Sequence, residues 1–87
     1  MAFTGQRVKR SVTEGDVLSG ITQVSTIEWV GATTAGHQCV LTDENGDNVW
    51  ESVADGQYFK DVHAHFDWVR DLTVTTLDSG TLYVYIL

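Results

Sequence analysis

Residues 71–87, DLTVTTLDSGTLYVYIL, decide the fold class of this chain. β-Branched and aromatic residues alternate on both sides of a short turn at residues 78–80, and a period of two is a strong strand signal. We therefore expect a β-hairpin here. Its second arm places Tyr83, Tyr85 and Leu87 on one face, which predicts an apolar stripe at an interface. The open alternative is a strand covered on both faces within the monomer.

The same alternation recurs in the preceding sequence. Strands are expected near residues 7–12, 17–30, 37–43 and 48–54, and an uncertain segment at 55–66 is interpreted as a loop followed by a short strand. Asn45-Gly46 predicts a type I′ hairpin turn, because both residues tolerate a positive φ. No window shows a clean helical period, so little or no helix is expected. Roughly six to seven strands with frequent turns predict a small all-β fold, an antiparallel β-sandwich or barrel.

The chain of 87 residues is long enough for one domain with a thin core. We expect a basic N-terminal arm at residues 1–16 and a single β domain at residues 17–87. The thin core favours oligomerisation. The expected core residues are Ile21, Val24, Ile27, Trp29, Cys39, Leu41, Trp50, Leu72, Val74, Leu82, Val84 and Ile86.

The net charge of −7 is unevenly distributed. Arg7, Lys9 and Arg10 are three of the five basic residues, and the first ten positions hold no acid, so this segment carries +3. The remaining two basic and twelve acidic residues give −10. Phosphate binding needs a cationic face, so we expect neither nucleic acid nor a membrane as partner. A basic arm on an acidic body suits docking onto an acidic protein surface. A solvated arm without a partner is the alternative.

Two histidines are the first candidate metal ligands. His63 and His65 are two residues apart, so on a strand both point to the same side. A third ligand has to come from His37 or Asp61, and the sequence offers no second paired element of the kind that structural sites use. Surface or interfacial histidines are therefore expected, and no metal.

The segment at residues 43–47 begins like a calcium loop, with Asp43, Asn45 and Asp47 at alternate positions. The pattern then fails, because the glycine falls one place early at Gly46 and Ala54 stands where the bidentate glutamate belongs. A hairpin turn explains these residues without calcium.

Catalysis by a nucleophile is not expected. Cys39 is the only cysteine and lies in an apolar strand pattern, where burial makes a thiol inert. A single cysteine also excludes a disulfide within the chain. No apolar leader and no membrane-span pattern is visible, so we expect a soluble protein made in a reducing cytoplasm and not an enzyme.

The tryptophans raise the alternative of a sugar-binding platform. Trp29, Trp50 and Trp68 can stack on sugars if exposed, although core packing is the simpler explanation. Trp68 is the one expected to be partly exposed, because it follows the irregular segment.

Two stretches carry a family resemblance: IEWVGATTAGHQCVLTDENGDNVWES at residues 27–52 and LTVTTLDSGTLYVYI at residues 72–86. They resemble small virion proteins of tailed bacteriophages, which include capsid decoration or cement proteins, head–tail adaptors, and fibre or spike modules. The resemblance implies non-enzymatic assembly, commonly as trimers, and a place in the virion after synthesis in the host cytoplasm. It is one of general pattern and transfers no binding residue position by position.

Together these observations predict a capsid decoration or cement protein. It binds the outer surface of the capsid as an oligomer, with a homotrimer favoured, and its partner is the major capsid protein or another virion protein. No cofactor is expected. The alternatives are a head–tail adaptor, a tail or fibre component, and, from another class, a carbohydrate-binding module. The expected partner-binding residues are Arg7, Lys9, Arg10, Trp68, Tyr83, Tyr85 and Leu87.

Overall fold

The computed structural model describes residues 8–64 and 68–86, and every regular element in these ranges is a β-strand. The predicted all-β class is confirmed. The described residues include no helix of the length and apolarity needed to cross a membrane. The strands are β1 (Val8–Val12), β2 (Val17–Ala32), β3 (Gln38–Thr42), β4 (Asn48–Val53), β5 (Phe59–Ala64), β6 (Trp68–Leu77) and β7 (Thr81–Ile86).

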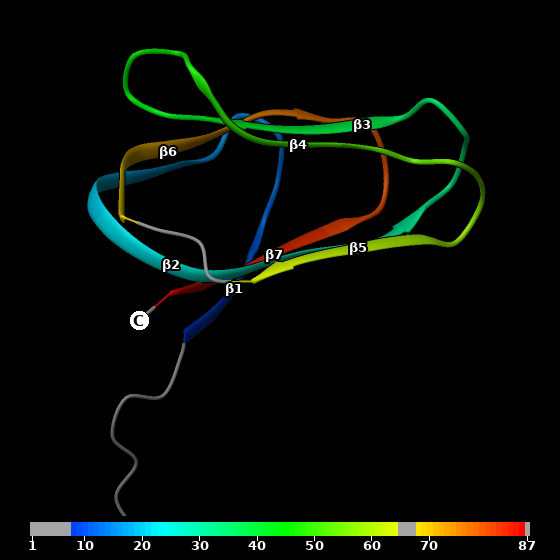
Figure 1. The fold of residues 1–87 in the computed structure, drawn as a ribbon, viewed down its shortest axis with the longest axis horizontal. Helices are drawn as coiled ribbons and strands as arrows, with labels where there is room; N and C mark the ends of the chain where they lie inside the picture. The colour runs from blue at the N-terminus through cyan, green and yellow to red at the C-terminus, as the bar shows by residue number, and fades with distance from the viewer. Residues whose placement is uncertain (1–7, 65–67, 87) are drawn as a thin grey trace, which may run out of the picture.

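The strands form two antiparallel layers that share β2 (Figure 1). In one layer, called here the β7 sheet, the order is β1-β7-β2-β5. In the other, the β6 sheet, the order is β2-β6-β3-β4. The fold is therefore a small antiparallel β-sandwich in which one long strand passes from layer to layer, as strands do at the corners of such sandwiches.

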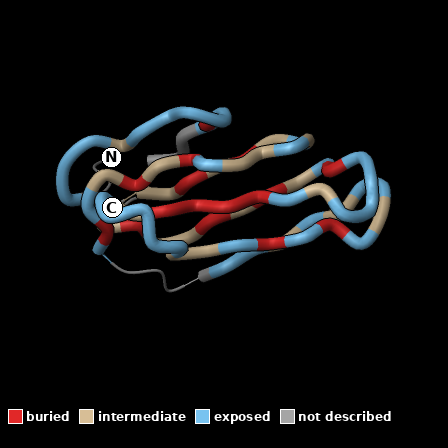
Figure 2. The backbone as a smooth tube through the Cα atoms, turned by 90° about the horizontal axis from the view of Figure 1, so that it is seen from above, coloured by how far each residue is buried: buried red, intermediate tan, exposed pale blue. Residues whose placement is uncertain are grey.

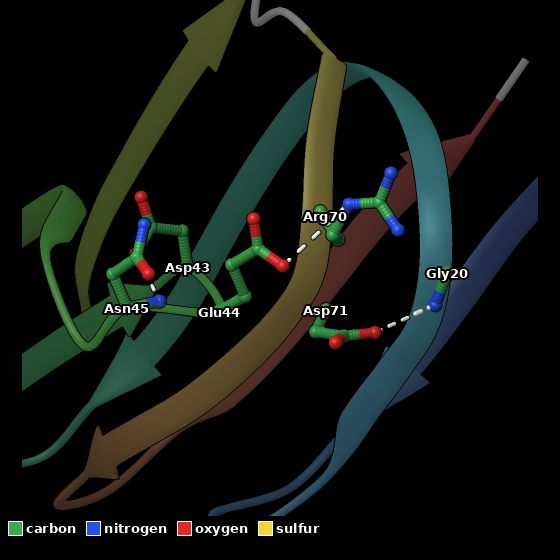
Figure 3. Close-up of polar contacts among 6 residues, drawn as sticks. All are labelled: Gly20, Asp43, Glu44, Asn45, Arg70 and Asp71. Carbon is green, nitrogen blue, oxygen red and sulfur yellow. Dashed lines mark hydrogen bonds and ion pairs between the residues drawn. The ribbon is translucent and has the colours of Figure 1, made fainter.

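The passage of β2 between the layers depends on bulges. Its first part pairs with β6 and its second part with β5 and β7, with register shifts near residues 18–21 and 24–26. At the first shift Gly20 has a φ of 84° and Asp71, across on β6, has a φ of 52°. The Gly20 N–H donates to Asp71 Oδ1 at 2.7 Å (Figure 3). A bulge bends a strand locally, and this carboxylate satisfies the amide that the bulge leaves without a ladder partner.

The predicted C-terminal hairpin is wrong, although both of its strands are present. β6 pairs with β2 and β3, whereas β7 pairs with β1 and β2, so the turn at residues 78–80 carries the chain from one sheet to the other (Figure 1). The turn packs on a buried side chain: Trp29 Nε1 donates to the Ser79 carbonyl at 2.8 Å. An alternating pattern shows that a segment is a strand, but it does not show which strand lies beside it.

The predicted hairpin between β3 and β4 is confirmed, but its turn is not type I′. Gly46 has a φ of 81°, whereas Asn45 has no positive φ. Asp43 N–H donates to the Asp47 carbonyl and Gly46 N–H to the Asp43 carbonyl, both at 3.0 Å, which closes a three-residue loop ending in a left-handed glycine. The Asp43 side chain stabilises this loop, because its Oδ1 accepts a hydrogen bond from the Asn45 N–H at 2.9 Å (Figure 3).

The core is formed by buried residues from both sheets, and Figure 2 shows the buried residues distributed along the strands. All of the expected core residues are buried except Ile21, Trp50 and Ile86. Trp50 and Ile86 are partly buried against the core, but Ile21 is 59% exposed, so its assignment was wrong. After the bulge, Ile21 lies opposite Arg70 of β6, which is exposed as well, so this pair is directed away from the core.

Residues 8–16 are the described part of the predicted N-terminal arm. β1 pairs with β7 along its length, and Val12 is buried in the core. The following turn contacts β6, because Gly15 N–H donates to the Val74 carbonyl at 2.8 Å and Leu77 N–H donates to Glu14 Oε1 at 2.9 Å. Residues 1–7 lie outside the described residues.

Candidate functional site

The outer face of the β7 sheet is the candidate functional surface. Leu82 and Val84 of β7 are completely buried, so Tyr83 and Tyr85 between them point away from the core. Tyr83 is opposite Glu28 of β2, and Glu28 is in turn opposite Val62 of β5. We call the resulting set the tyrosine face: Glu28, Lys60, Val62, Tyr83 and Tyr85.

Glu28 is the polar centre of this face. Tyr85 Oη donates to Glu28 Oε1 at 3.1 Å, and Lys60 Nζ lies 3.6 Å from Glu28 Oε2. The Glu28 side chain is only 20% exposed, whereas that of Lys60 is 60% exposed. An ion pair with one exposed partner contributes at most about 1 kcal/mol to stability. Its main effect here is to hold Tyr85 and Lys60 in place across three strands.

The composition of the tyrosine face is that of a protein interface. Two half-buried tyrosines and Val62, which is 49% exposed, provide apolar contact area next to a hydrogen-bonding centre. Aromatic residues are enriched where proteins contact one another, and tyrosine combines an apolar ring with a polar tip. Of the five described residues that make up the face, Lys60 is the one cation, and a phosphate backbone is bound by a cluster of cations.

The structure places part of the predicted basic arm beside this face. Lys9 of β1 is in register with Tyr85, and Arg10 is in register with Val84. Arg7 and Leu87, both predicted to bind a partner, lie outside the described residues. Of the seven predicted partner-binding residues, β1 and β7 thus bring four together in adjacent strands.

Trp68 is not part of that group. It begins β6 and pairs with Gln23 in the other sheet, where it is 60% exposed. Ile21, two residues before Gln23 on β2, is exposed as well. Two residues after Trp68 on β6, Arg70 Nε lies 3.5 Å from Glu44 Oε2 (Figure 3). The expectation that Trp68 is partly exposed is confirmed. It belongs to a second, separate apolar surface on the outer face of the β6 sheet.

His37 and His63 have structural partners. The His63 ring lies 6.5 Å from the Trp50 ring, and the neighbouring Asp61 accepts a hydrogen bond from Ser52 Oγ at 2.6 Å. These contacts join β5 to β4 across the two sheets. His37 Nδ1 lies 2.7 Å from Ser79 Oγ, and His65 falls outside the described residues. Within the described ranges, no group of three metal-binding side chains comes together.

The Asp43 carboxylate is used by its own turn. Its Oδ1 accepts the N–H groups of Asn45 and Asp47 at 2.9 and 3.1 Å. Both contacts are local and stabilise the loop between β3 and β4, which accounts for the alternating acidic and amide residues of the calcium-like pattern.

The Cys39 thiol is poorly suited to nucleophilic chemistry. Its side chain is completely buried. Desolvation by burial, together with the smaller effect of the nearby negative charges of Asp61 and Asp78, raises the pKa of Cys39 from 9.0 to about 12. The thiol therefore stays protonated at neutral pH, whereas a nucleophilic cysteine needs the thiolate.

The tryptophans do not form one platform. Trp29 is completely buried, with its ring edge-on to Phe59 at a centroid distance of 5.5 Å. Trp50 is partly buried against the core. Only Trp68, of the three, has an exposed fraction above one half.

One exposed aromatic residue was missed by the sequence analysis. Tyr58 is 82% exposed, has a φ of 63°, and donates its N–H to the Ala32 carbonyl at 2.8 Å. A left-handed conformation is unfavourable for a bulky residue, and glycine or asparagine is the usual signal for it. The sequence contains no such signal at position 58, so pattern reasoning had no means of finding it.

Comparison with known proteins identifies no relative: no family model, no curated protein and no solved structure matches this chain.

Proposed function

We propose that this protein is a non-enzymatic structural protein of a bacteriophage virion, a capsid decoration or cement protein that binds the outer surface of the capsid as an oligomer. The observation that carries the proposal is the tyrosine face, an aromatic sheet surface with a hydrogen-bonded centre. The virion context comes from the resemblance of residues 27–52 and 72–86 to small phage virion proteins.

The size of the tyrosine face supports binding as an oligomer. Three strands spaced ~4.8 Å apart, each with about six residues at ~3.3 Å, cover roughly 300 Å². A stable one-to-one interface buries about 800 Å² on each partner. One face is therefore too small for tight binding alone. Several copies joined together multiply the contact, because after the first copy binds the others bind at high effective concentration.

The direct test uses purified capsids that lack the protein. The double variant Tyr83→Ala/Tyr85→Ala removes both rings from the face, and Tyr58→Ala is the matched control, since Tyr58 is an exposed tyrosine that precedes β5 and is not one of the five residues of the face. We expect the double variant to bind capsids at least about tenfold more weakly in a co-sedimentation assay, with the control unchanged. Equal binding by wild type and the double variant, with intact circular dichroism, contradicts the proposal.

The basic segment has a separate test. Because β1 begins at Val8, deletion of residues 1–7 removes Arg7 and leaves the strand intact. If the segment contacts an acidic capsid surface, the deletion weakens binding and reduces its dependence on salt. Undiminished binding at low salt rules out that contact.

The head–tail adaptor and the tail or fibre component are alternatives that use the same kind of protein-binding face. Electron microscopy of gold-labelled protein mixed with intact particles distinguishes them: label over the capsid supports decoration, and label confined to the neck or tail supports the alternatives.

The carbohydrate-binding module is the second candidate from another class, and exposed Trp68 is the observation that favours it. Aromatic side chains stack on apolar sugar faces. Saturable quenching of tryptophan fluorescence by host glycans that disappears in Trp68→Phe supports this candidate. Fluorescence that does not change on titration counts against it.

A further inference from the structure

Three strands have a neighbour on one side only. Among the described residues, β1 pairs only with β7, β4 only with β3, and β5 only with β2. β1 and β4 are the two ends of the sheet path β1-β7-β2-β6-β3-β4. A strand at an edge presents unpaired N–H and C=O groups that another chain can pair with, and proteins usually protect such edges with charge, proline or bulges.

The three edges differ in protection. β5 carries Lys60 on its outer face, while Asp61 and His63 reach across to β4. Inward-pointing polar residues and lysine are both known protections of an edge. β1 contains Lys9 and Arg10 and no acid. β4, with the sequence NVWESV, contains neither lysine, arginine nor proline.

The backbone groups on the open side of β4 can be identified. Ala54 N–H donates to the His37 carbonyl, and Gly36 N–H donates to the Ala54 carbonyl, both at 2.8 Å. Both backbone groups of Ala54 therefore point toward the β3 side. Alternate residues of a strand direct these groups to opposite sides, so the N–H and C=O groups of Val53 and Glu51 point to the open edge. Val53 is also 49% exposed.

We propose that β4 of one copy pairs with β1 of a second copy, antiparallel, so that subunits join head to tail. Charge decides between the possible pairings. Pairing two β4 strands sets two acidic strands side by side, and pairing two β1 strands sets two basic strands side by side, both unfavourable. β1 with β4 pairs a strand that contains two cations with one whose only charge is negative. The same asymmetry exists between residues 1–10, at +3, and the remainder, at −10.

Head-to-tail pairing determines the type of assembly. Because each copy has one β1 edge and one β4 edge, the contact is heterologous, and such contacts generate closed rings when the rotation per subunit allows it. A ring of three agrees with the trimer expected from the resemblance. The strand pairing rests on the proposed function, which requires an oligomer, and it names the strands that form that oligomer.

The first experiment compares Val53→Pro with Val53→Thr by light scattering over a wide concentration range. Proline removes the Val53 N–H that faces the open edge and is tolerated on edge strands, whereas threonine keeps the N–H and the β-branched shape. We expect wild type and Val53→Thr to be oligomeric and Val53→Pro to be monomeric, with at least a tenfold higher dissociation constant. Monomeric wild type at all concentrations, or oligomeric Val53→Pro, overturns the proposal.

Charge reversal provides a second measurement that does not depend on proline. Glu51→Lys is expected to dissociate the oligomer, and Asp55→Lys, which changes an exposed acid outside β4, is not. A variant with Lys9→Glu and Arg10→Glu has a disabled β1 edge and an intact β4 edge. Mixed with Val53→Pro, which has the reverse, it is expected to form a one-to-one dimer. Absence of that dimer contradicts head-to-tail pairing.

Capsid binding separates this inference from the proposed function. Monomeric Val53→Pro retains the tyrosine face, so it is expected to bind capsids measurably but more weakly than wild type. If it binds as tightly as wild type, the strand pairing does not matter for decoration. If neither protein binds, the proposed function fails while the oligomer measurement still stands.

Discussion

Gly80→Ala tests the passage of the chain between the two sheets. Gly80 has a φ of 79°, and a Cβ added there lies 2.6 Å from the Val30 carbonyl oxygen and 2.9 Å from the Ala32 nitrogen. Both atoms belong to the backbone of β2, the strand that holds the sheets together, so neither can move cheaply. The same Cβ lies 3.0 Å from Trp29 Nε1, the donor that holds the turn.

The magnitude has two parts. Alanine in the left-handed region costs about 1–2 kcal/mol, and forcing extra atoms into a packed site typically costs a further ~1–3 kcal/mol. Gly46→Ala isolates the first part, because Gly46 has almost the same φ, 81°, with nothing within 4 Å of the added Cβ. The whole chain of 87 residues is worth only roughly 4–13 kcal/mol, so the difference is easily measured.

The assay is urea and thermal unfolding followed by tryptophan fluorescence. Relative to Gly46→Ala, Gly80→Ala is expected to lose about 2 kcal/mol more in the free energy of unfolding, which for a chain of this size is about 8–16 °C in Tm. Equal midpoints for the two variants mean that the turn at residues 78–80 does not pack on β2 as described, and the reasoning is refuted.

Three further predictions follow from buried or strained groups. Trp29→Phe removes the donor to the Ser79 carbonyl and is expected to cost about 1–3 kcal/mol in urea unfolding; a loss no greater than that of Trp68→Phe contradicts this. Because the pKa of Cys39 is raised to about 12 from 9.0, the folded state holds this proton while the unfolded state loses it above pH 9. The free energy of unfolding therefore keeps this contribution at pH values well below 9 and should fall by about 1.4 kcal/mol between pH 8 and pH 10. Cys39→Ala should not show this loss, and identical pH profiles for wild type and Cys39→Ala would disprove the prediction. Asp71→Ala should cost about 1–3 kcal/mol in thermal unfolding, because it loses the bond to Gly20 N–H and puts alanine at a φ of 52°, while Asp71→Asn should cost less; the reverse order would show that the bulge does not depend on this side chain.

Local patterns predicted the strands well because alternation is a direct consequence of burying one face. The segments around Val24, Leu41 and Val74 all show it, and all three residues are buried. The errors arose where two strands had to be matched. The sequence at residues 78–80 has the composition of a hairpin turn. In the structure this turn instead connects the two sheets, and the buried Trp29 indole holds it there by a hydrogen bond to the Ser79 carbonyl. That contact joins residues 50 apart in sequence, and no local pattern contains it.

The candidate surface was predictable in part for the same reason. Tyr83 and Tyr85 face outward because their neighbours Leu82 and Val84 face inward, and this follows from the period of two. The grouping with Glu28 depends on the pairing of β2 with β7, which alternation does not determine. Trp68 was expected to be exposed and is, but its membership of the other sheet follows from the register of β6 against β2.

The sharing of β2 between the sheets also sets the order in which the molecule is assembled during translation. β2 pairs with β5, β6 and β7, and among the described residues β1 pairs with β7 alone, so strands made early on the ribosome wait for strands made later. At ~5–20 residues per second, several seconds of synthesis separate β1 from β7. A nascent chain that ends before residue 81 therefore lacks the strand that β1 and half of β2 need, and its cooperative folding begins only after β7 has left the exit tunnel.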